Sequence, residues 1–527
     1  MKRFFAILLV LVFLAGCTPG ANGGKVEAPG APGTETAQPG ASQGAPAEEK
    51  RVLTIAQTAD ITTFDTQNAF NTPTDSVLCN MFSQLLERDA VNNQIPRVAI
   101  SVENVDETTW RAVLRQDVTF HNGDKLTAED VKFTFERVST DETLAVQPYY
   151  SPIKEVKVID EYTCDFITDG PMPTLKIMTS FSGSWILPKK YIEENGWEYF
   201  LKNPVGSGPY KLKEWVRDDR VVLVPYENYF EGVQTEWDEV VFRAMPESAT
   251  RVGELLTGGV DIALNIPPNE WSRIESNDGT EILYGETSYV PVLILRLTEG
   301  WPTADLKVRQ AMEMAINRVQ IAEMLYQGAA TPTRTRMTPG CFGSQPTLYN
   351  TDNYNPDEAK RLLAESSYNG EPLTFNAGRG RFILDGELAE MISGMLSEVG
   401  FNINLEISDW STFVDIYRSK SNKDILMIGL GDSLYDCSDS LLHYTVKRAE
   451  GQTDYVNEET DRLFKEAGKN LDVAEREAQY QRIQDIVAID LPHIPLVQIK
   501  SVFGVASDIQ YVPALVENIH ITDVHRK

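Results

Sequence analysis

Apolar and polar residues alternate most clearly in a stretch near position 110. From Thr109 to Thr119 every second side chain tends to be apolar, which is typical of a half-buried strand. Asn122-Gly123 then predicts a turn. Thr127 has the character of a helix cap, because Asp130 follows three residues later and can complete a capping box. We therefore expect a strand, a turn and a capped helix in this order.

Helical spacing of apolar residues marks the second half of the chain. Asp305 to Gly328 carries apolar side chains three to four positions apart, so one helix ending at Gly328 is expected. Asn355-Pro356 predicts the start of another helix, and 387–399 forms a further one that Gly400 should end. The alternation at 401–407 predicts a strand. Because helices and strands alternate without a fixed repeat period, an α/β fold is favoured.

The N-terminal end has the layout of a secretion signal. Met1-Lys2-Arg3 is basic, an apolar run follows from Phe4 to Leu14, and Ala15-Gly16-Cys17 closes it. A membrane-spanning helix needs about 20 apolar residues, so this run is too short to span. Leu14 to Cys17 is similar to a bacterial lipobox. We expect 1–17 to be a lipoprotein signal peptide, with lipid attached to Cys17 and the mature protein held outside the cytoplasm, in the periplasm or on the outer face of the membrane.

The next segment, 18–50, is rich in Gly, Pro, Ala, Ser and Gln and poor in large apolar residues. Such a composition cannot offset the entropy of ordering, so a disordered tether is expected. The rest of the 527-residue chain is long enough for several domains and contains no second hydrophobic span.

The charge balance excludes one class of partner. The chain has 48 basic and 77 acidic residues, a net charge of −29, which argues against binding to a nucleic-acid backbone. Besides Cys17 there are four cysteines, Cys79, Cys164, Cys341 and Cys437. An exported protein can form disulfides, but free buried thiols are an equal alternative and three full pairings are possible. Their wide spacing does not indicate a metal cluster, and no cofactor is expected.

Several motifs resemble the family 5 extracellular solute-binding proteins of ABC importers, which include dipeptide, oligopeptide, nickel and oligosaccharide receptors. They occur in the family's order and span most of the mature chain. The motifs are Trp110-Arg111-Ala112-Val113-Leu114-Arg115 through Asp124, Leu126-Thr127-Ala128-Glu129-Asp130-Val131, Pro204-Val205-Gly206-Ser207-Gly208-Pro209-Tyr210, Val308-Arg309-Gln310-Ala311 with Ala315-Ile316-Asn317-Arg318, Asn355 to Leu363, and Leu491-Pro492-His493-Ile494-Pro495-Leu496. Gly123 and Gly208 are expected to supply backbone freedom in turns, and Trp110 to be a core residue.

The resemblance implies a two-lobed, type II periplasmic-binding-protein-like α/β fold with an extra subdomain in the first lobe. Lobe I would comprise 51–83, 205–290 and 490–527, the extra subdomain 84–204, and lobe II 291–489. A ligand would bind between the lobes, and closure of the hinge would exclude water from it.

The resemblance also implies candidate ligand contacts. In dipeptide-binding members a carboxylate holds the peptide's α-amine, and Asp432 occupies that position. Arg379 occupies the position of the arginine that holds the α-carboxylate, with Arg381 as its nearby substitute. The family often has a Trp before this Asp and an Asp-Pro pair after it. Here Leu430 replaces the Trp, and Asp436, a further candidate ligand contact, is followed by cysteine.

Other residues near these loops are weaker candidates. Tyr435 could pack on the ligand, as could Tyr444. The remaining candidates are Phe70, Asn71, Ser184 and Trp185. We expect a monomeric receptor that binds a short peptide and delivers it to an ABC permease driven by ATPase subunits.

Four other function classes compete with peptide binding. A hydrolytic enzyme is disfavoured because the chain has no Gly-x-Ser-x-Gly or His-Glu-x-x-His motif, and Ser151-Pro152-Ile153-Lys154 has no accompanying Lys-Thr-Gly. A nickel or metal-chelate receptor shares the fold, but the five histidines form no recognisable ligand set. An oligosaccharide receptor would need aromatic side chains stacked in the cleft, which the sequence cannot place. A signalling or adhesion receptor of the same fold is the remaining alternative.

Overall fold

A computed structural model describes residues 50–68, 70–232 and 236–527. The predicted signal peptide, Cys17 and the tether up to residue 49 lie outside the described residues. Residues 50–527 form one compact unit. Within the described ranges, no helix is both long and apolar enough to cross a membrane.

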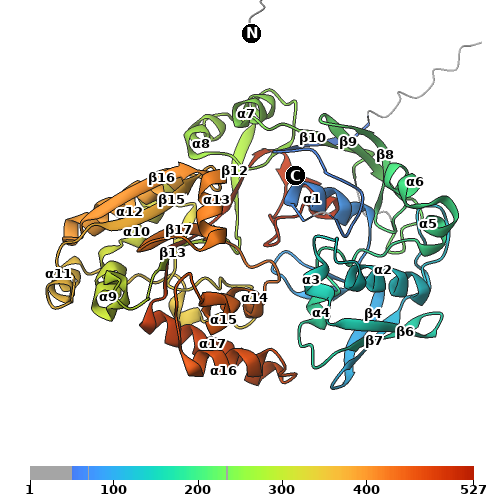
Figure 1. Ribbon diagram of the computed structural model, residues 1–527. Helices are drawn as coiled ribbons and strands as arrows, with labels where there is room; N and C mark the ends of the chain where they lie inside the picture. Colours follow the sequence, from blue (N-terminus) through green and yellow to red (C-terminus); the bar gives the residue numbers. More distant parts are fainter. Residues whose placement is uncertain (1–49, 69, 233–235) are drawn as a thin grey trace, which may run out of the picture. The chain divides into compact units, whose positions relative to one another are not determined.

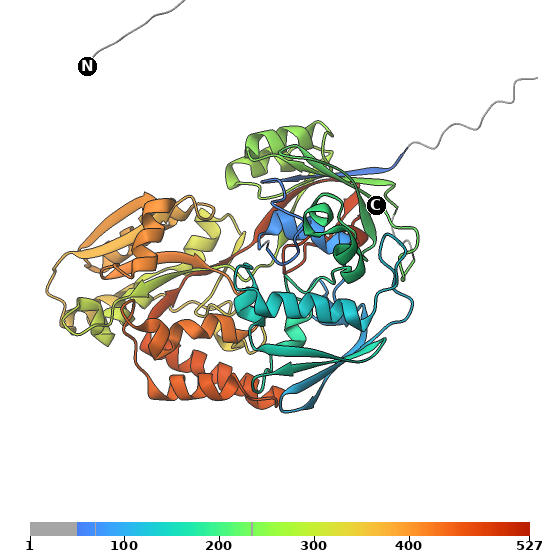
Figure 2. The ribbon, with the colours of Figure 1, turned by 45° about the vertical axis from the view of Figure 1, so that its right-hand side comes forward.

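The largest sheet joins the beginning, the middle and the end of this unit. Its strand order is β12-β20-β11-β1-β10-β9-β8, with β1 parallel to β10 and β11 and the other pairs antiparallel. Blue, green and red segments accordingly run side by side (Figure 2). The strands are β1 (Val52–Gln57), β8 (Tyr210–Val216), β9 (Arg220–Pro225), β10 (Glu239–Ala244), β11 (Ile262–Ala263), β12 (Thr280–Gly285) and β20 (Ser501–Ala506).

Helices cover both faces of this sheet. Leu53 and Ile55 of β1 pack into a core with α1 (Thr72–Met81), whereas Ala56 packs into a core with α7 (Ser248–Leu256) and α8 (Pro268–Glu275). Figure 1 shows α7 and α8 above the sheet and α1 below it. The short helices α5 (Lys189–Asn195) and α6 (Trp197–Lys202) extend the α1 side.

A four-stranded antiparallel sheet of order β4-β5-β7-β6 lies within the predicted extra subdomain. Its strands are β4 (Ala99–Asp106), β5 (Thr109–Leu114), β6 (Ile153–Asp160) and β7 (Thr163–Thr168). Trp110, Ala112 and Leu114 are buried against α2 (Ala128–Thr140), so the predicted alternation and the core role of Trp110 are confirmed. The Thr127 N–H donates to Asp130 Oδ2 over 2.9 Å in the predicted capping box. The strand ends at Leu114, earlier than expected.

Shorter elements complete this region. They are the hairpin β2 (Leu86–Arg88) and β3 (Gln94–Pro96), and the helices α3 (Gln147–Tyr150) and α4 (Leu175–Met178).

A five-stranded mixed sheet of order β16-β15-β17-β13-β18 lies within the second predicted lobe and the start of the C-terminal segment. Strand β15 is parallel to β16 and β17, and β13 is antiparallel to β17 and β18. The strands are β13 (Val290–Leu295), β15 (Leu373–Arg379), β16 (Ile403–Asp409), β17 (Ile425–Leu430) and β18 (His493–Pro495). Its helices are α9 (Leu306–Ala315), α10 (Arg318–Gln320), α11 (Pro356–Ala364), α12 (Asp385–Val399) and α13 (Trp410–Ser419).

Two of the predicted helices are confirmed in this region. Asn355 accepts a hydrogen bond from the Glu358 N–H over 3.1 Å at the start of α11, with Pro356 as the first helical residue. Helix α12 ends before Gly400, as predicted, and the φ of 112° at Gly400 is in the left-handed region that glycine favours. The helix begins at Asp385, two residues earlier than predicted.

The prediction of one helix from Asp305 to Gly328 is wrong. Helix α9 ends at Ala315, and Asn317 caps a new turn by accepting a hydrogen bond from the Gln320 N–H over 2.8 Å. A single π-helical turn, η2 (Ile321–Leu325), follows. Apolar spacing continues through the break, and for this reason the sequence pattern did not reveal it.

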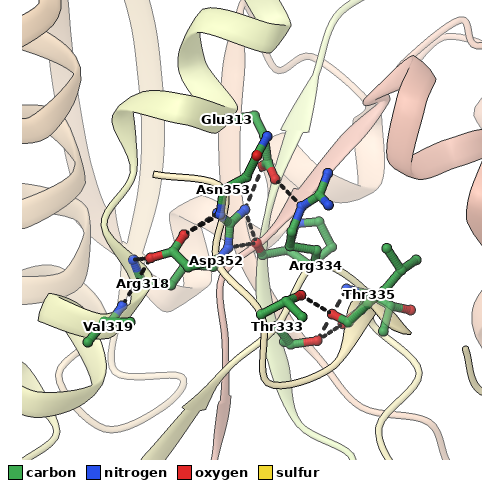
Figure 3. A network of polar contacts seen from close by, with 11 residues as sticks. Glu313, Arg318, Val319, Thr333, Arg334, Thr335, Asp352 and Asn353 are labelled. Atoms are coloured by element: carbon green, nitrogen blue, oxygen red, sulfur yellow. Dashed lines mark hydrogen bonds and ion pairs between the residues drawn. The ribbon is translucent and has the colours of Figure 1, made fainter. Parts of the chain in front are cut away.

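The break places Arg318 in a buried polar network. Arg318 is fully buried and forms ion pairs with Glu313 at 2.6 Å and Asp352 at 3.3 Å, and Glu313 also pairs with Arg334 at 2.8 Å (Figure 3). The Arg318 Nε donates to the Pro495 carbonyl over 2.9 Å. The motif that ends at Arg318 is thus joined to the motif that contains Pro495, through the Arg318 side chain and the Pro495 backbone.

The helices that follow β17 form a separate group beside the five-stranded sheet, drawn in orange and red (Figures 1 and 2). They are α14 (Cys437–Leu441), α15 (Val446–Ala449), α16 (Glu458–Ala467) and α17 (Val473–Asp490). The remaining elements are β14 (Ala330–Pro332) paired with β19 (Val497–Ile499), β21 (Ile509–Gln510) paired with β22 (His525–Arg526), and the 3-10 turns η1 (Pro302–Ala304), η3 (Pro346–Leu348), η4 (Leu442–Tyr444) and η5 (Ile521–Asp523).

The two motif glycines have different roles. Gly123 has a φ of 89°, so it supplies the backbone freedom expected in a turn. Gly208 is instead required for close packing, because a Cβ there would lie 2.6 Å from the Asn80 carbonyl oxygen at the end of α1. The four cysteines in the described part of the chain are free thiols, and Cys164, Cys341 and Cys437 are buried.

Candidate functional site

A cavity of about 330 Å³ is lined by segments that are far apart in the sequence. One wall comes from α1, β2 and the loop 180–185. The opposite wall comes from the loops that follow β15 and β17, and residues 516–520 complete the cavity. This volume is within the range of small-molecule sites, and the carboxyl ends of sheet strands are common positions for such sites.

Asp432, predicted to hold an amine, lines this cavity. Its side chain is 1% exposed, Oδ1 accepts a hydrogen bond from the Asp436 N–H over 3.2 Å, and Oδ2 is buried with no partner in the described part of the chain. Ser288 fixes the backbone, because its Oγ accepts from the Asp432 N–H over 2.9 Å. Burial, reinforced by the Asp439 carboxylate, raises the pKa of Asp432 to about 7. A cationic group of a ligand would stabilise the buried, ionised carboxylate of Asp432.

Asp436 does not line the cavity. Its carboxylate pairs with Arg476 through two contacts of 2.8 and 2.6 Å, and it caps α14 by accepting from the Ser438 N–H over 3.0 Å. Both carboxylate oxygens therefore already have partners within the fold.

The two predicted arginines lie in different surroundings. Arg381 lines the cavity, and its guanidinium carbon is 5.9 Å from the Tyr289 ring centre and 5.4 Å from that of Trp410. Arg379 is not among the lining residues; its side chain is 49% exposed and pairs with Glu387 at 3.3 Å and Glu390 at 3.4 Å on α12. To reach the cavity, Arg379 would have to leave these partners.

Tyr435 lines the cavity from the loop after β17. Its hydroxyl donates to the Leu515 carbonyl over 2.5 Å, which joins this loop to the C-terminal segment. The Arg88 guanidinium carbon lies 5.6 Å from the centre of the Tyr435 ring. Tyr435 has a φ of 56°, which is unusual for a residue with a side chain, so this loop is held in a specific conformation.

The weaker candidates also divide into residues that line the cavity and residues that do not. Phe70, Asn71 and Trp185 line the cavity, whereas Ser184 and Tyr444 are buried elsewhere.

Four charged residues that sequence reasoning missed also line the cavity: Asp75 on α1, Glu87 and Arg88 on β2, and Glu517 near the C-terminus. Asp75 is 8% exposed; its Oδ2 accepts from Ser182 Oγ over 3.3 Å, and its buried Oδ1 has no partner among the described residues. Burial raises the pKa of Asp75 and of Glu517 to about 7.

Histidines do not form a cluster at this cavity. His520 alone among them lines it, and its Nδ1 is 3.3 Å from Glu87 Oε1. In the described ranges, no group of three or more His, Cys, Asp or Glu side chains could hold a metal ion.

The chain is similar in sequence and fold to known proteins. Residues 93–452 match the family model of the bacterial extracellular solute-binding proteins, family 5 Middle. The chain is 24% identical to the oligopeptide-binding protein AppA of Bacillus subtilis over 481 residues, covering 84% of this chain and 85% of AppA. It is 25% identical to the periplasmic oligopeptide-binding protein OppA of Escherichia coli over 480 residues, covering 85% and 87% of the two chains.

A structural relative has the same fold. The dipeptide-binding protein from Pseudoalteromonas sp. SM9913, solved in complex with Met-Leu, superposes with a TM-score of 0.71 at 22% identity, covering 90% of this chain and all of the other. The fold implied by the sequence motifs is thereby confirmed. This chain belongs to family 5 of the bacterial extracellular solute-binding proteins.

Proposed function

We propose that this protein binds short peptides in the cavity and passes them to the permease of an ABC importer. The observation that carries the proposal is the Asp432 carboxylate, which lines the cavity, is 1% exposed and has an oxygen without a partner in the described chain. A buried carboxylate of this kind requires a cation, and the free α-amine of a peptide supplies one.

The surroundings of Asp432 support a peptide as the ligand. The cavity also contains positive charge at Arg381 and aromatic surface at Phe181 and Tyr435, so it offers partners for a carboxylate and for apolar side chains. The names of AppA and OppA, which describe them as oligopeptide-binding, favour the same ligand class.

Of the two arginines predicted to hold a carboxylate, we assign a contact at the cavity mouth to Arg381. It lines the cavity, whereas Arg379 pairs with Glu387 and Glu390 outside it. Because Arg381 is exposed, water and salt screen its charge and its contribution to affinity should be modest.

The protein then acts as a receptor that binds and releases its ligand unchanged. We propose that it works as a monomer, that lipid on Cys17 holds it at the membrane, and that it docks on permease and ATPase subunits. A Cys17→Ser variant should lose incorporation of a labelled fatty acid and be partly shed into the medium. Equal labelling of the variant and the wild type would contradict the anchor.

Native mass spectrometry of the purified protein tests the ligand class. A cavity of this kind often retains its ligand, so we expect a series of added masses that tandem fragmentation identifies as short peptides. A single mass identified as a metal chelate or an oligosaccharide would contradict the proposal.

A further inference from the structure

Arg88 is a buried cation that forms no direct ion pair with a carboxylate in the described part of the chain. It ends β2, lines the cavity and is 7% exposed. Its Nε donates to Ser180 Oγ over 3.3 Å, and its Nη2 is buried with no hydrogen-bond partner among the described residues. Nor does Arg88 form an ion pair with any carboxylate in those residues.

A guanidinium differs from the cavity's carboxylates in one decisive respect. Asp75 and Asp432 can take up a proton and become neutral when no cation is present. Arginine remains protonated in proteins, so Arg88 cannot remove the cost of its burial in this way. An uncompensated buried charge is strongly unfavourable and requires a partner.

Aromatic rings meet this need in part. The Arg88 guanidinium carbon lies 5.8 Å from the centre of the Phe181 ring and 5.6 Å from that of Tyr435. A ring face attracts a cation but offers no lone pair to the N–H groups. The unpartnered Nη2 thus requires a hydrogen-bond acceptor, and the cavity is where a ligand can bring one.

We propose that Arg88 is the principal group that binds a carboxylate of the ligand. This inference rests on the proposed function, because a peptide supplies both an amine for Asp432 and a carboxylate for Arg88. The carboxylate can belong to the peptide's C-terminus or to an acidic side chain. Burial makes this contact stronger than one with the exposed Arg381, because a desolvated charge-assisted hydrogen bond is screened less.

Electrostatics within the cavity agree with a zwitterionic ligand. Burial lowers the pKa of Arg88, and the Asp432 carboxylate opposes that effect. The Asp432 carboxylate therefore acts on Arg88 across the site. A ligand with an amine and a carboxylate would compensate both residues at once.

Calorimetry with three peptides tests this inference: Ala-Ala-Ala with a free carboxylate, the same peptide amidated, and amidated Ala-Glu-Ala. All three keep a free amine, so the contact with Asp432 is constant. The variants are Arg88→Gln, Arg381→Gln and a matched control, Arg97→Gln. Arg97 follows β3, pairs with Glu87 at 2.5 Å and Glu231 at 3.5 Å, and does not line the cavity.

The wild type should bind a carboxylate-bearing peptide about 100-fold more tightly than amidated Ala-Ala-Ala, as expected for a desolvated charge pair. Arg88→Gln should reduce that preference to less than about threefold, whereas Arg381→Gln and Arg97→Gln should retain most of it. If amidated Ala-Glu-Ala binds more tightly than the free acid, the preferred carboxylate comes from a side chain; if it binds as weakly as amidated Ala-Ala-Ala, the carboxylate comes from the C-terminus. Arg88→Lys keeps the charge but not the planar donors, so it should retain part of the preference.

Thermal unfolding without ligand separates binding from a structural role. Because Arg88→Gln removes an unpaired buried charge, the melting temperature of the unliganded variant should equal or exceed that of the wild type. A lower melting temperature with an unchanged carboxylate preference would overturn the inference. So would a wild type that binds all three peptides equally, although peptide binding itself would stand. A wild type that binds none of them contradicts the proposed function and this inference together.

Discussion

The backbone N–H of Asp436 donates a hydrogen bond to the side chain of Asp432 over 3.2 Å, yet these two buried aspartates have opposite electrostatic surroundings. Asp436 is compensated by two contacts with Arg476. Asp432 has an unpartnered oxygen and lines the cavity. The same loop therefore contains one carboxylate bound within the fold and one left available to a ligand.

Asp436→Asn should destabilise the protein. The substitution leaves Arg476, whose side chain is 5% exposed, without its anion, and breaking a buried pair typically costs about 3–5 kcal/mol. Urea unfolding measures the change in the free energy of unfolding. Asp432→Asn is the control, because it removes an unpaired charge and should not destabilise the unliganded protein. Equal destabilisation by both variants would contradict the distinction between them.

Binding of free-amine peptides should weaken below about pH 7. The pKa of Asp432 in the unliganded protein is raised to about 7, so at lower pH the carboxyl must release a proton before it can pair with an amine. Affinity should fall by up to about tenfold per pH unit on the acid side. Calorimetry from pH 5.5 to 7.5 measures this slope. In Asp432→Asn the slope should disappear, and its persistence would assign the titration to Asp75 or Glu517.

Asp75→Asn should stabilise the unliganded protein at alkaline pH. The pKa of Asp75 is about 7 in the folded state and 3.8 ordinarily. Between these two pH values the folded state binds more protons than the unfolded state, so the free energy of unfolding falls as the pH rises. The variant cannot ionise, and its advantage should grow from about pH 4 to reach about 2–4 kcal/mol at pH 8.

A matched control for Asp75 is Asp65→Asn. Asp65 is 4% exposed but pairs with Arg137 at 2.8 Å, so the same substitution should lower stability there. Thermal unfolding of both variants across this pH range measures the contrast. A stability difference between Asp75→Asn and the wild type that does not change with pH would refute the account of Asp75.

Arg318→Met should destabilise the fold without changing ligand preference. The substitution removes a fully buried guanidinium that pairs with Glu313 and Asp352, at an expected cost of about 3–5 kcal/mol. Arg361→Met is the surface control, because its side chain is 53% exposed and water and salt screen its pairs with Glu358 and Glu365. Similar urea midpoints for the two variants would show that the buried network does not stabilise the fold.

The sequence predicted those features of the fold that local chemistry determines. The capping box at Thr127, the helix start at Asn355 and the helix end at Gly400 depend on side chains within a few residues, and all are present. The break after Ala315 was missed because its cause is distant in sequence. Arg318 turns inward to meet Asp352 and the Pro495 carbonyl, and no local pattern contains those partners.

The candidate site was predictable only in part, for the same reason. Asp432 and Arg381 could be named from the resemblance and Tyr435 from its position near Asp432, and all three line the cavity. Arg88 belongs to no motif that we recognised, and its importance comes from burial without an anion, which only the folded chain reveals. Whether Arg379 contacts ligand stays a prediction, because in this structure it pairs with α12.

Calorimetry of wild type and Asp432→Asn, each with one tripeptide whose amine is free or acetylated, tests the central claim most directly. The wild type should bind the free-amine form about 100-fold more tightly, because acetylation leaves the buried Asp432 carboxylate uncompensated. Asp432→Asn should bind the two forms with affinities within about threefold of each other. A wild type that binds both forms equally, or a variant that keeps the full preference, would contradict the claim that this cavity recognises a peptide amine through Asp432.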